Sequence, residues 1–390
     1  MLTLAVFADD LTGALDTGVQ FAASGVKTAV TVGTTPPAGC TVAVCDLETR
    51  HVSPAEAAAR TAEAVRAAQT RGARYLYVKT DSGLRGNIGA ALSALLSGGD
   101  CVLFAPAYPE NGRVTVNGVH LIDGVPVSRS LFGRDARTPV RHDRVADILR
   151  ANADVPVRAL GEGAPIPEHA GGVLVADAAT DAALAAHARA ALGAGVTRFA
   201  GCAGFARQLE RVLVLPHGET RRTFARAPLL VVCGSVSPVS RAQLAAARAD
   251  GVPCFRINDA QGDGFARVRA ALSREGCAVV ASAFDEADVR ENDTAGMTAQ
   301  TVAAALGNIA CHAAETCRCG LYVIGGDTLM AVVQALGACV IVPAFEAASG
   351  VVACSLDWNG GERLLVTKSG SFGAQDAITA ILRQYAPAST

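Results

Sequence analysis

Two adjacent aspartates, Asp9 and Asp10, follow an apolar run at the start of the chain. Residues 1 to 8 have the length and hydrophobicity of a buried strand, and after Asp10 the apolar spacing becomes helical. The pair is therefore expected at the carboxyl end of a strand, where open α/β sheets bind ligands. Adjacent carboxylates can hold a metal ion or accept a proton from a hydroxyl group. Helix capping by Asp10 or Thr12 is the simpler role, but it accounts for one residue and not for the pair.

A second polar cluster occupies residues 79 to 87, between a predicted strand and a predicted helix. It combines the cations of Lys79 and Arg85 with the carboxylate of Asp81, two hydroxyl groups and two glycines. Loops of this composition pack poorly and commonly line a site. Lysine is rare in this chain, where basic positions are usually arginine, so Lys79 suits a need for a compact point charge. The cluster is predicted to be functional.

Arg113 follows a stiff segment that contains two prolines and then Gly112. A planar guanidinium held on such a turn suits the recognition of a carboxylate. The alternative is a surface arginine on a rigid turn. Residues 114 to 127 alternate in hydrophobicity, which predicts a hairpin with Asp123-Gly124 as its turn.

The second half of the chain carries three loops of glycine and hydroxyl residues, each after a predicted strand. Small residues at a helix N-terminus leave amide donors free to bind an anion, as phosphate sites require. Ser-Pro at a helix start is also common capping, so the agreement of the three loops carries more weight than any one. The residues concerned are Ser235 and Ser237 in the first loop, Gly325, Gly326, Asp327 and Thr328 in the second, and Lys368 and Gly370 in the third.

Strands alternate with helices along most of the chain, which predicts mainly parallel sheets flanked by helices. Residues 216–227 are polar and rich in arginine without an apolar period, and they are the best candidate for a linker. The chain is thus expected to be an α/β protein of two domains, residues 1–215 and 228–390. Its length of 390 residues agrees with more than one domain.

Composition excludes several classes of protein. The net charge of −2 gives no basic field, so nucleic acid and anionic membranes are not expected as partners. No apolar run approaches the roughly 18 residues that span a bilayer, and Asp9 and Asp10 interrupt the start of the chain where a signal peptide would be apolar. A cytoplasmic protein is expected.

Familiar metal and nucleotide signatures are absent from the sequence. Cys311, His312, Cys317 and Cys319 lie close together, but their spacing fits no common zinc pattern, and no metal-ligating residue is predicted. There is no G-x-x-x-x-G-K-[ST] motif, and no G-x-G-x-x-G follows the first strand. A P-loop enzyme and a Rossmann dehydrogenase are therefore not expected.

With these residues assembled, the chain resembles the four-carbon acid sugar kinase family nearly from end to end. Six motifs occur in the family's order: ADDLTGALDTG at 8–18, KTDSGLRGN at 79–87, PAYPENGR at 106–113, GSVSPVS at 234–240, GGDT at 325–328 and KSGSFG at 368–373. The resemblance implies an N-terminal substrate domain and a C-terminal nucleotide domain, with the active site in the cleft between them. It also implies ATP-dependent phosphorylation of a tetronate, such as erythronate, threonate or 3-oxo-tetronate, at the terminal hydroxyl.

The resemblance further implies the residues of the two binding sites. ATP should contact Ser235 or Ser237, residues 325 to 328, and Gly370 near Lys368. The sugar acid should contact Asp9, Asp10, Lys79, Asp81, Arg85 and Arg113. The chain departs from the family in three places: Gly83 stands where threonine is usual, Asp327 where glutamate is usual, and residues 349–355 keep only the glycine of a Pro-Gly-Val-Pro type motif.

Phosphoryl transfer needs in-line positioning and positive charge around the moving group. The expected arrangement is ATP with Mg²⁺, Arg85 and Arg113 on the acid's carboxylate, Asp10 or Asp81 as proton acceptor, and Lys79 or Lys368 against the phosphates. Two alternatives remain open: a sugar-acid binding or sensing protein without catalysis, and an aldolase or lyase that uses Lys79 as a Schiff base. The sequence leaves open which tetronate is used and whether the chain forms a homodimer.

Overall fold

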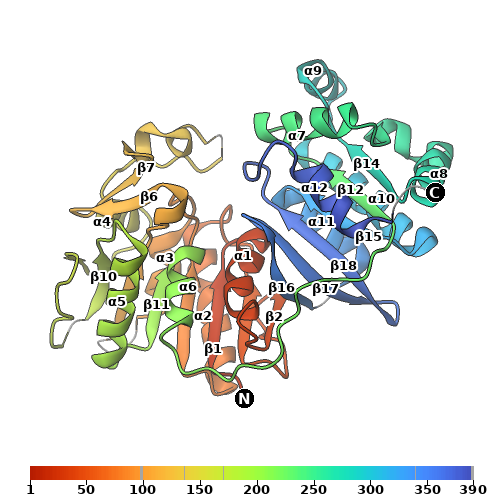
Figure 1. Cartoon of the computed structure of the whole chain (residues 1–390). Coiled ribbons are helices and arrows are strands. Elements are labelled where there is room, and N and C mark those ends of the chain that lie inside the picture. Colours follow the sequence, from red (N-terminus) through yellow and green to blue (C-terminus); the bar gives the residue numbers. More distant parts are fainter. Residues whose placement is uncertain (97–99, 136, 170, 339, 388–390) are drawn as a thin grey trace. The chain divides into compact units, whose positions relative to one another are not determined.

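The structure is a computed structural model that describes residues 1–96, 100–135, 137–169, 171–338 and 340–387. The chain divides into two compact units, Met1–Thr220 and Arg221–Thr390 (Figure 1). Each unit is an α/β layer structure with its own buried core. The predicted α/β class with mainly parallel sheets is confirmed.

In the first unit, eight strands lie in the order β2-β3-β1-β4-β11-β5-β10-β9, and all of their pairings are parallel. Apolar residues fill these strands because helices cover both faces; all five residues of β1 are buried. The strands are β1 (Leu4–Ala8), β2 (Thr28–Val32), β3 (Val42–Asp46), β4 (Tyr75–Lys79), β5 (Cys101–Ala105), β9 (Val157–Leu160), β10 (Gly172–Ala176) and β11 (Arg198–Gly201).

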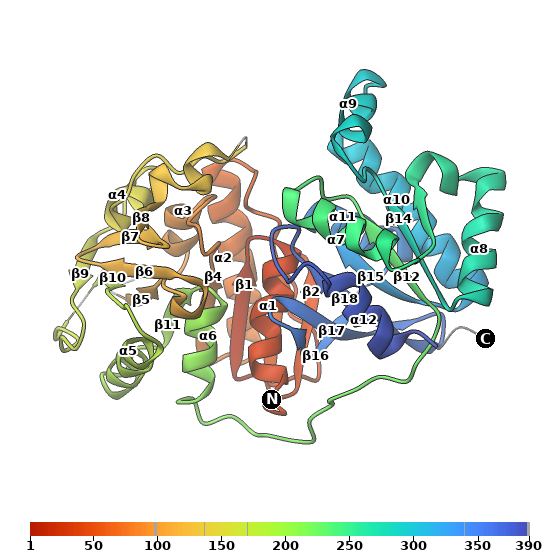
Figure 2. The same cartoon turned by 45° about the horizontal axis from the view of Figure 1, so that its top comes forward.

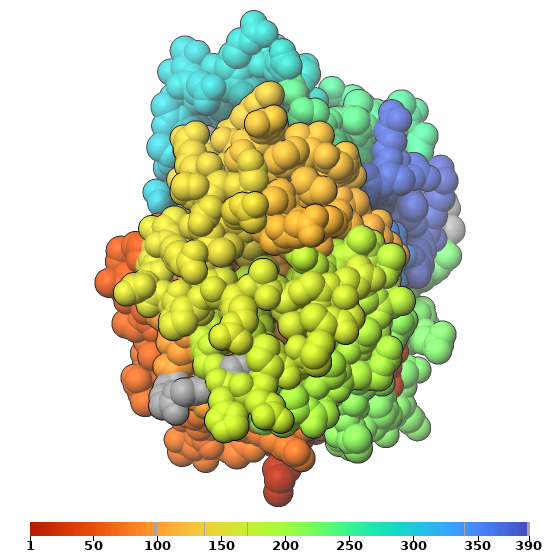
Figure 3. Space-filling model, turned by 90° about the vertical axis from the view of Figure 1, so that its left-hand side faces the viewer, coloured from red at the N-terminus to blue at the C-terminus, as the bar shows by residue number. Residues whose placement is uncertain are grey.

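The helices of this unit form two rows, one made by α1, α6 and α5 and the other by α2, α3 and α4. Right-handed crossovers between parallel strands require rows on opposite faces when the strand order reverses, as it does on the two sides of β1. Segments around β10 and α5, yellow to yellow-green, form much of the face in Figure 3. The helices are α1 (Leu11–Ala22), α2 (Pro54–Thr70), α3 (Ile88–Ser93), α4 (Val145–Arg150), α5 (Asp181–Gly193) and α6 (Ala203–Glu210).

A small antiparallel sheet follows β5 and consists of β6 (Arg113–Val116), β7 (Val119–Ile122) and β8 (Val125–Pro126). The predicted hairpin is present with Asp123-Gly124 as its turn, and the structure adds a preceding strand and a first turn that were not predicted. Asn117 and Gly118, both with positive φ, connect β6 to β7, whereas Asp123-Gly124 makes the second turn, between β7 and β8. Both dipeptides suit a turn with two positive φ values, so the sequence pattern allowed either.

In the second unit, the strand order is β13-β14-β12-β15-β18-β17-β16, with β17 antiparallel to both of its neighbours in this order. Helices α7 and α12 pack together, as do α8, α10 and α11 (Figures 1 and 2). The strands are β12 (Leu229–Cys233), β13 (Cys254–Arg256), β14 (Cys277–Ala281), β15 (Gly320–Ile324), β16 (Ile341–Ala348), β17 (Val351–Trp358) and β18 (Gly361–Lys368). The helices are α7 (Pro238–Ala249), α8 (Phe265–Arg274), α9 (Glu286–Thr294), α10 (Ala299–Cys317), α11 (Gly326–Leu336) and α12 (Ala377–Tyr385).

Across the residues that the structure describes, no helix combines the length and apolar character needed to span a bilayer.

Candidate functional site

Asp9 and Asp10 lie directly after β1, at the carboxyl edge of the first sheet. Asp10 caps α1, because its Oδ1 accepts a hydrogen bond from the backbone N–H of Gly13 at 3.0 Å. The same carboxylate also forms ion pairs with Arg50 and Lys79, so helix capping does not account for all of its contacts. Its side chain is 24% exposed, against 14% for Asp9, which makes Asp10 the more accessible of the two carboxylates.

Arg50 joins these carboxylates, and the sequence analysis did not single it out. It follows β3, the strand beside β1, and its Nε donates to Asp9 Oδ2 at 2.7 Å while Nη1 donates to Asp10 Oδ2 at 2.8 Å. Its Nη2 lies 3.8 Å from Asp81 Oδ1 and makes no hydrogen bond with the described residues. Arg50 therefore holds three carboxylates and keeps donor capacity on Nη2.

Lys79 is the last residue of β4, the strand on the other side of β1. Its Nζ lies 3.3 Å from Asp9 Oδ1 and 3.2 Å from Asp10 Oδ1. Burial by itself raises the pKa of Asp10, but the charges of Arg50 and Lys79 outweigh it and hold that pKa well below its ordinary value. Burial opposes the charge of Lys79 as well, but Asp10 and Asp9 keep its pKa above its ordinary value. Both groups are charged at neutral pH.

Asp81 and Arg85 form a two-point ion pair within the same loop. Arg85 Nε donates to Asp81 Oδ2 at 2.8 Å and Nη2 donates to Asp81 Oδ1 at 3.0 Å, while Nη1 donates to Asp135 Oδ2 at 2.9 Å. Asp81 Oδ2 also accepts from the backbone N–H of Gly83 at 3.2 Å. Burial by itself raises the pKa of Asp81, but the charges of Arg50 and Arg85 outweigh it and keep that pKa far below its ordinary value. Asp135 is a further residue that the sequence analysis did not predict at the site.

Arg113, at the start of β6, reaches the same loop and donates to Ser82 Oγ. The fully buried ring of His120 on β7 holds the loop from the other side, with Nε2 donating to Ser82 O at 3.0 Å and Nδ1 accepting from Thr115 Oγ1 at 3.1 Å. Burial lowers the pKa of His120 to about 4, so the ring is neutral at physiological pH. The small antiparallel sheet therefore fixes the loop that carries Asp81 and Arg85.

A cavity of about 590 Å³ adjoins this network in the first unit. Apolar side chains such as Leu84 and Ile148 line part of it, and among the described residues no aspartate or glutamate lines it. Six basic side chains line the cavity, those of Arg50, His51, Arg85, Arg137, Arg141 and His142. A cavity with this lining is suited to an anionic ligand. The structure therefore brings Asp9, Asp10, Lys79, Asp81, Arg85 and Arg113 into one region with Arg50.

Gly13 determines how close Lys79 can come to the acid pair. A Cβ at position 13 would overlap Nζ of Lys79. Glycine to alanine inside a helix normally stabilises by about 1 kcal/mol, but Gly13→Ala is expected to destabilise the fold because it displaces a buried ammonium from its carboxylates. Gly193→Ala in α5, where a Cβ would meet nothing within 4 Å, is the matched control and should be neutral or stabilising. Thermal or denaturant unfolding of the two variants measures the difference; equal effects would show that the contact with Lys79 is unimportant.

In the second unit, the three predicted loops follow β12, β15 and β18, which are adjacent parallel strands. A Cβ on Gly234 would overlap Thr328 Oγ1, one on Gly325 would lie 3.6 Å from Ser235 Cβ, and one on Gly370 would overlap Ser235 Oγ. The three loops therefore meet, and at these positions a side chain would fill the space between them. Ser237 caps α7 and also donates to Gly370 O at 2.6 Å.

The third loop is held by hydrogen bonds to its carbonyl oxygens. Lys368 Nζ donates to Ser369 O and Phe372 O, each at 2.9 Å. Gln243 Nε2 donates to three successive carbonyls of the loop, those of residues 372 to 374, and Ser240 Oγ donates to Gly370 O at 2.8 Å. These hydrogen bonds, together with that from the N–H of Phe372 to Ser369 O, fix the backbone of the loop. Lys368 is only 1% exposed, so its side chain lies beneath the loop and holds it through these hydrogen bonds.

The structure shows the surroundings of two of the positions compared with the family pattern. Gly350, the glycine retained in residues 349–355, has φ +67° in the turn between β16 and β17, and a Cβ there would lie 3.1 Å from the Phe372 ring. Asp327 lies exposed in the first turn of α11, where an acidic residue complements the helix dipole.

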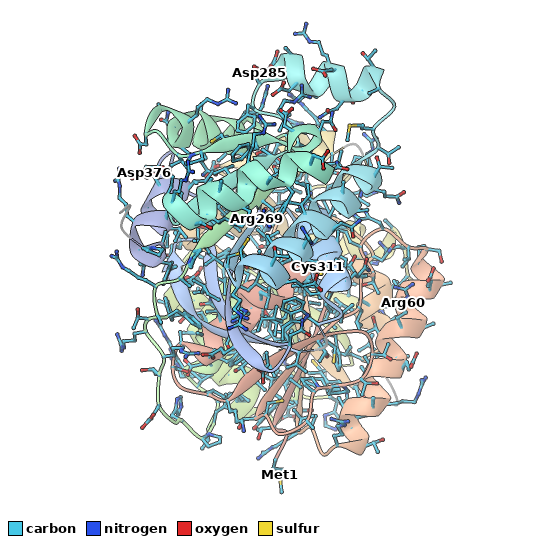
Figure 4. All side chains as sticks on the ribbon, turned by 90° about the vertical axis from the view of Figure 1, so that its right-hand side faces the viewer. Met1, Arg60, Arg269, Asp285, Cys311 and Asp376 are labelled. Atoms are coloured by element: carbon cyan, nitrogen blue, oxygen red, sulfur yellow. The ribbon has the colours of Figure 1, made fainter. Side chains whose placement is uncertain are left out.

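Cys311 lies on α10 (Figure 4). Cys317 ends that helix and Cys319 lies just before β15. Within the described ranges, no group of three or more His, Cys, Asp or Glu side chains is placed to hold a metal ion.

Family models of known proteins match both units of the chain. A family model described as a sugar-binding N-terminal domain matches residues 4–209, and one described as a nucleotide-binding C-terminal domain matches residues 230–378. The chain is 33% identical over 261 residues to a D-threonate kinase of Salmonella typhimurium, covering 62% of this chain and 60% of that one. It is 31% identical to the D-threonate kinase of Cupriavidus necator, covering 96% and 95% of the two chains.

A 3-oxo-tetronate kinase of Methylobacterium radiotolerans is 30% identical, with 96% of this chain and 97% of that one covered. Among solved structures, a Salmonella typhimurium LT2 protein described as a tRNA synthase aligns with a TM-score of 0.84 over 99% of this chain and 100% of that one, at 22% identity. That likeness shows a shared fold. Since both family models match and full-length relatives exceed 30% identity, the chain belongs to the four-carbon acid sugar kinase family.

Proposed function

We propose that this protein is an ATP-dependent kinase that phosphorylates the terminal hydroxyl of a four-carbon sugar acid, giving the 4-phosphate. The observation that carries the proposal is the cluster of Asp9, Asp10, Arg50 and Lys79 beside a cavity lined by basic side chains. The relatives named above as D-threonate and 3-oxo-tetronate kinases support the same activity.

The sugar acid would bind in the first unit. Arg50 is added here to the predicted Arg85 and Arg113, because its Nη2 has donor capacity left after the ion pairs with Asp9 and Asp10. A guanidinium suits a carboxylate, whereas the carboxylates of Asp9 and Asp10 suit hydroxyl groups, which donate to them. The acid's carboxylate would therefore lie toward the basic cavity and its hydroxyls toward the aspartates.

Asp10 is the better candidate for the proton acceptor. Both oxygens of each carboxylate accept hydrogen bonds, those of Asp10 from Gly13, Lys79 and Arg50 and those of Asp81 from Arg85. Exposure distinguishes the two, because the Asp81 side chain is 11% exposed and that of Asp10 is 24% exposed. The depressed pKa of Asp10 makes it a weak base, which suits phosphoryl transfer because the hydroxyl needs orientation first and loses its proton late. Lys79, paired with Asp10, would hold that carboxylate in place and offset negative charge near the transferred group.

ATP would bind to the three loops of the second unit, through Ser235, Ser237, residues 325 to 328 and Gly370. Mg²⁺ is usually held by one or two carboxylates together with the phosphates, and the exposed Asp327 beside the buried Thr328 fits that donor set. When bound, the ion would neutralise phosphate oxygens. Catalysis requires the phosphoryl group held by the second unit to reach the hydroxyl held by the first.

The test is ADP release from Mg-ATP with a panel of D- and L-threonate, D- and L-erythronate and the 3-oxo-tetronates, with no acid as the blank. ADP formation with one acid well above the blank is expected. Acid binding without ADP would favour the sensing protein. A Schiff-base lyase is disfavoured because Lys79 is paired with two carboxylates and its raised pKa keeps it protonated, so borohydride trapping should give no adduct.

The pH dependence of ATP use is expected to report on Lys368. Burial lowers its pKa to about 8. If its charge helps to hold the phosphates, kcat/KM for ATP should fall as the pH rises from 7 to 9.5, with a midpoint near 8, while Lys368→Arg should give a flat profile. The free energy of unfolding should instead increase above pH 8. In that range Lys368 still binds a proton in the unfolded chain but has lost it in the folded protein. A flat wild-type profile would exclude a role for this charge.

A further inference from the structure

We propose that Phe132 is a positioning residue that sets the spacing of Arg85 and Arg113, and that position 83 must be glycine to admit its ring. The inference rests on the proposed function, because it concerns the two arginines expected to bind the sugar acid. Phe132 lies in the 3₁₀ turn Leu131–Arg134 and is 6% exposed.

The phenyl ring lies within cation–π range of both guanidinium groups. The central carbon of the Arg85 guanidinium is 5.2 Å from the ring centroid, and that of Arg113 is 5.3 Å from it. Attraction of this kind operates within about 6 Å and is strongest where water is excluded. One aromatic ring can therefore fix two like charges that would otherwise repel each other.

The ring itself is held firmly. The backbone N–H of Phe132 donates to Ser130 Oγ at 3.2 Å, and its carbonyl accepts from the N–H of Val140 at 3.1 Å. The side chain is part of the buried core that includes Leu84 and Val127. The position of the ring is thus determined by the fold and not by the arginines.

Gly83 lies directly against this ring. A Cβ at position 83 would overlap three atoms of the Phe132 ring. The φ of Gly83 lies outside the left-handed region, so the requirement for glycine here is one of space. The N–H of Gly83 also donates to Asp81, which links the loop to the ion pair with Arg85. A side chain at position 83 would therefore displace the ring and, with it, both arginines.

Without the ring, Arg85 keeps its ion pairs to Asp81 and Asp135, and Arg113 keeps its hydrogen bond to Ser82. The fold of the loop should therefore survive, while the separation of the two guanidinium groups becomes less defined. Binding of one planar carboxylate by two guanidinium groups is sensitive to that separation. The expected effect is weaker binding of the sugar acid with little change in ATP use.

The test compares Phe132→Leu, Phe132→Tyr and Gly83→Ala. KM for acid and for ATP, and the Kd of the acid by calorimetry without ATP, are measured on each. Phe132→Leu is expected to raise KM and Kd for the acid roughly tenfold, and Phe132→Tyr, which keeps the π face, to stay within about threefold. Gly83→Ala should resemble Phe132→Leu, and the double variant Gly83→Ala/Phe132→Leu should be less impaired than the product of the two effects, because both act through one contact.

The matched control is Phe199→Leu on β11, a buried phenylalanine of the same unit whose ring packs on Tyr75 and Phe205. It should lower thermal stability and leave the ratio of acid KM to ATP KM unchanged. The proposal is overturned if Phe132→Leu behaves like Phe199→Leu, or if leucine and tyrosine at position 132 weaken acid binding equally. If the wild-type protein binds a tetronate but releases no ADP, the proposed kinase activity is refuted, and the Kd values of the variants still test the role of Phe132. If the wild-type protein binds no tetronate, both proposals are refuted.

Discussion

Replacing Asp10 with asparagine is expected to lower kcat by roughly 10² to 10⁴ fold, the usual loss on removal of a general base. Asparagine has nearly the same shape and caps helices as well as aspartate, so the contact with the N–H of Gly13 and the start of α1 should persist. The KM for ATP should stay close to that of the wild type. Steady-state kinetics with the acid identified by the ADP panel measures the effect.

Asp81→Asn is the variant to compare with Asp10→Asn, because the two together show which carboxylate accepts the proton. Because both oxygens of Asp81 accept hydrogen bonds from Arg85, its loss should reduce stability and raise the KM for the acid, with a smaller effect on kcat than Asp10→Asn. If the kcat effects were reversed, Asp81 would be the base. If turnover in both variants were unchanged, neither carboxylate would accept the proton.

Replacing Arg50 with methionine is expected to destabilise the first unit by about 3–5 kcal/mol, the typical cost of leaving buried charges without a partner. Arg50 is 11% exposed and faces three carboxylates, those of Asp9, Asp10 and Asp81. Activity should be lost as well, because the acid pair would lose its position and the sugar acid would lose a donor. Denaturant unfolding and the ADP assay at saturating acid measure the two effects.

The matched control is Arg290→Met on α9, where the ion pair with Glu286 is exposed on both sides. That variant should change stability by no more than about 0.5 kcal/mol.

The pH dependence of stability gives a second test of the Arg50 ion pairs. Because Asp10 and Asp81 have depressed pKa values in the folded protein, their contribution is complete above about pH 4 and is lost as the pH falls further. Arg50→Met should therefore show a shallower loss of stability below pH 4; an equally steep loss would contradict the assigned ion pairs.

The sequence by itself determined the places where chemistry is available. Asp9 and Asp10 after β1, Lys79 at the end of β4, and the three glycine loops after β12, β15 and β18 were all found from local signals. Each signal is an apolar run that stops at polar residues, and it depends on neighbours a few positions away. Because parallel strands end at one edge of a sheet, such signals also predict that the residues within each unit share an edge.

Tertiary structure decided which of these groups are paired with one another. Arg50 lies 41 residues from Asp9, and Asp135 lies 50 residues from Arg85, so no local pattern distinguished them from the other arginines and aspartates of the chain. Their contacts depend on the order β3-β1-β4 and on how the turn with Phe132 packs over the loop at Gly83. Strand order and packing are set by burial over the whole unit, and the pattern of any single segment does not contain them.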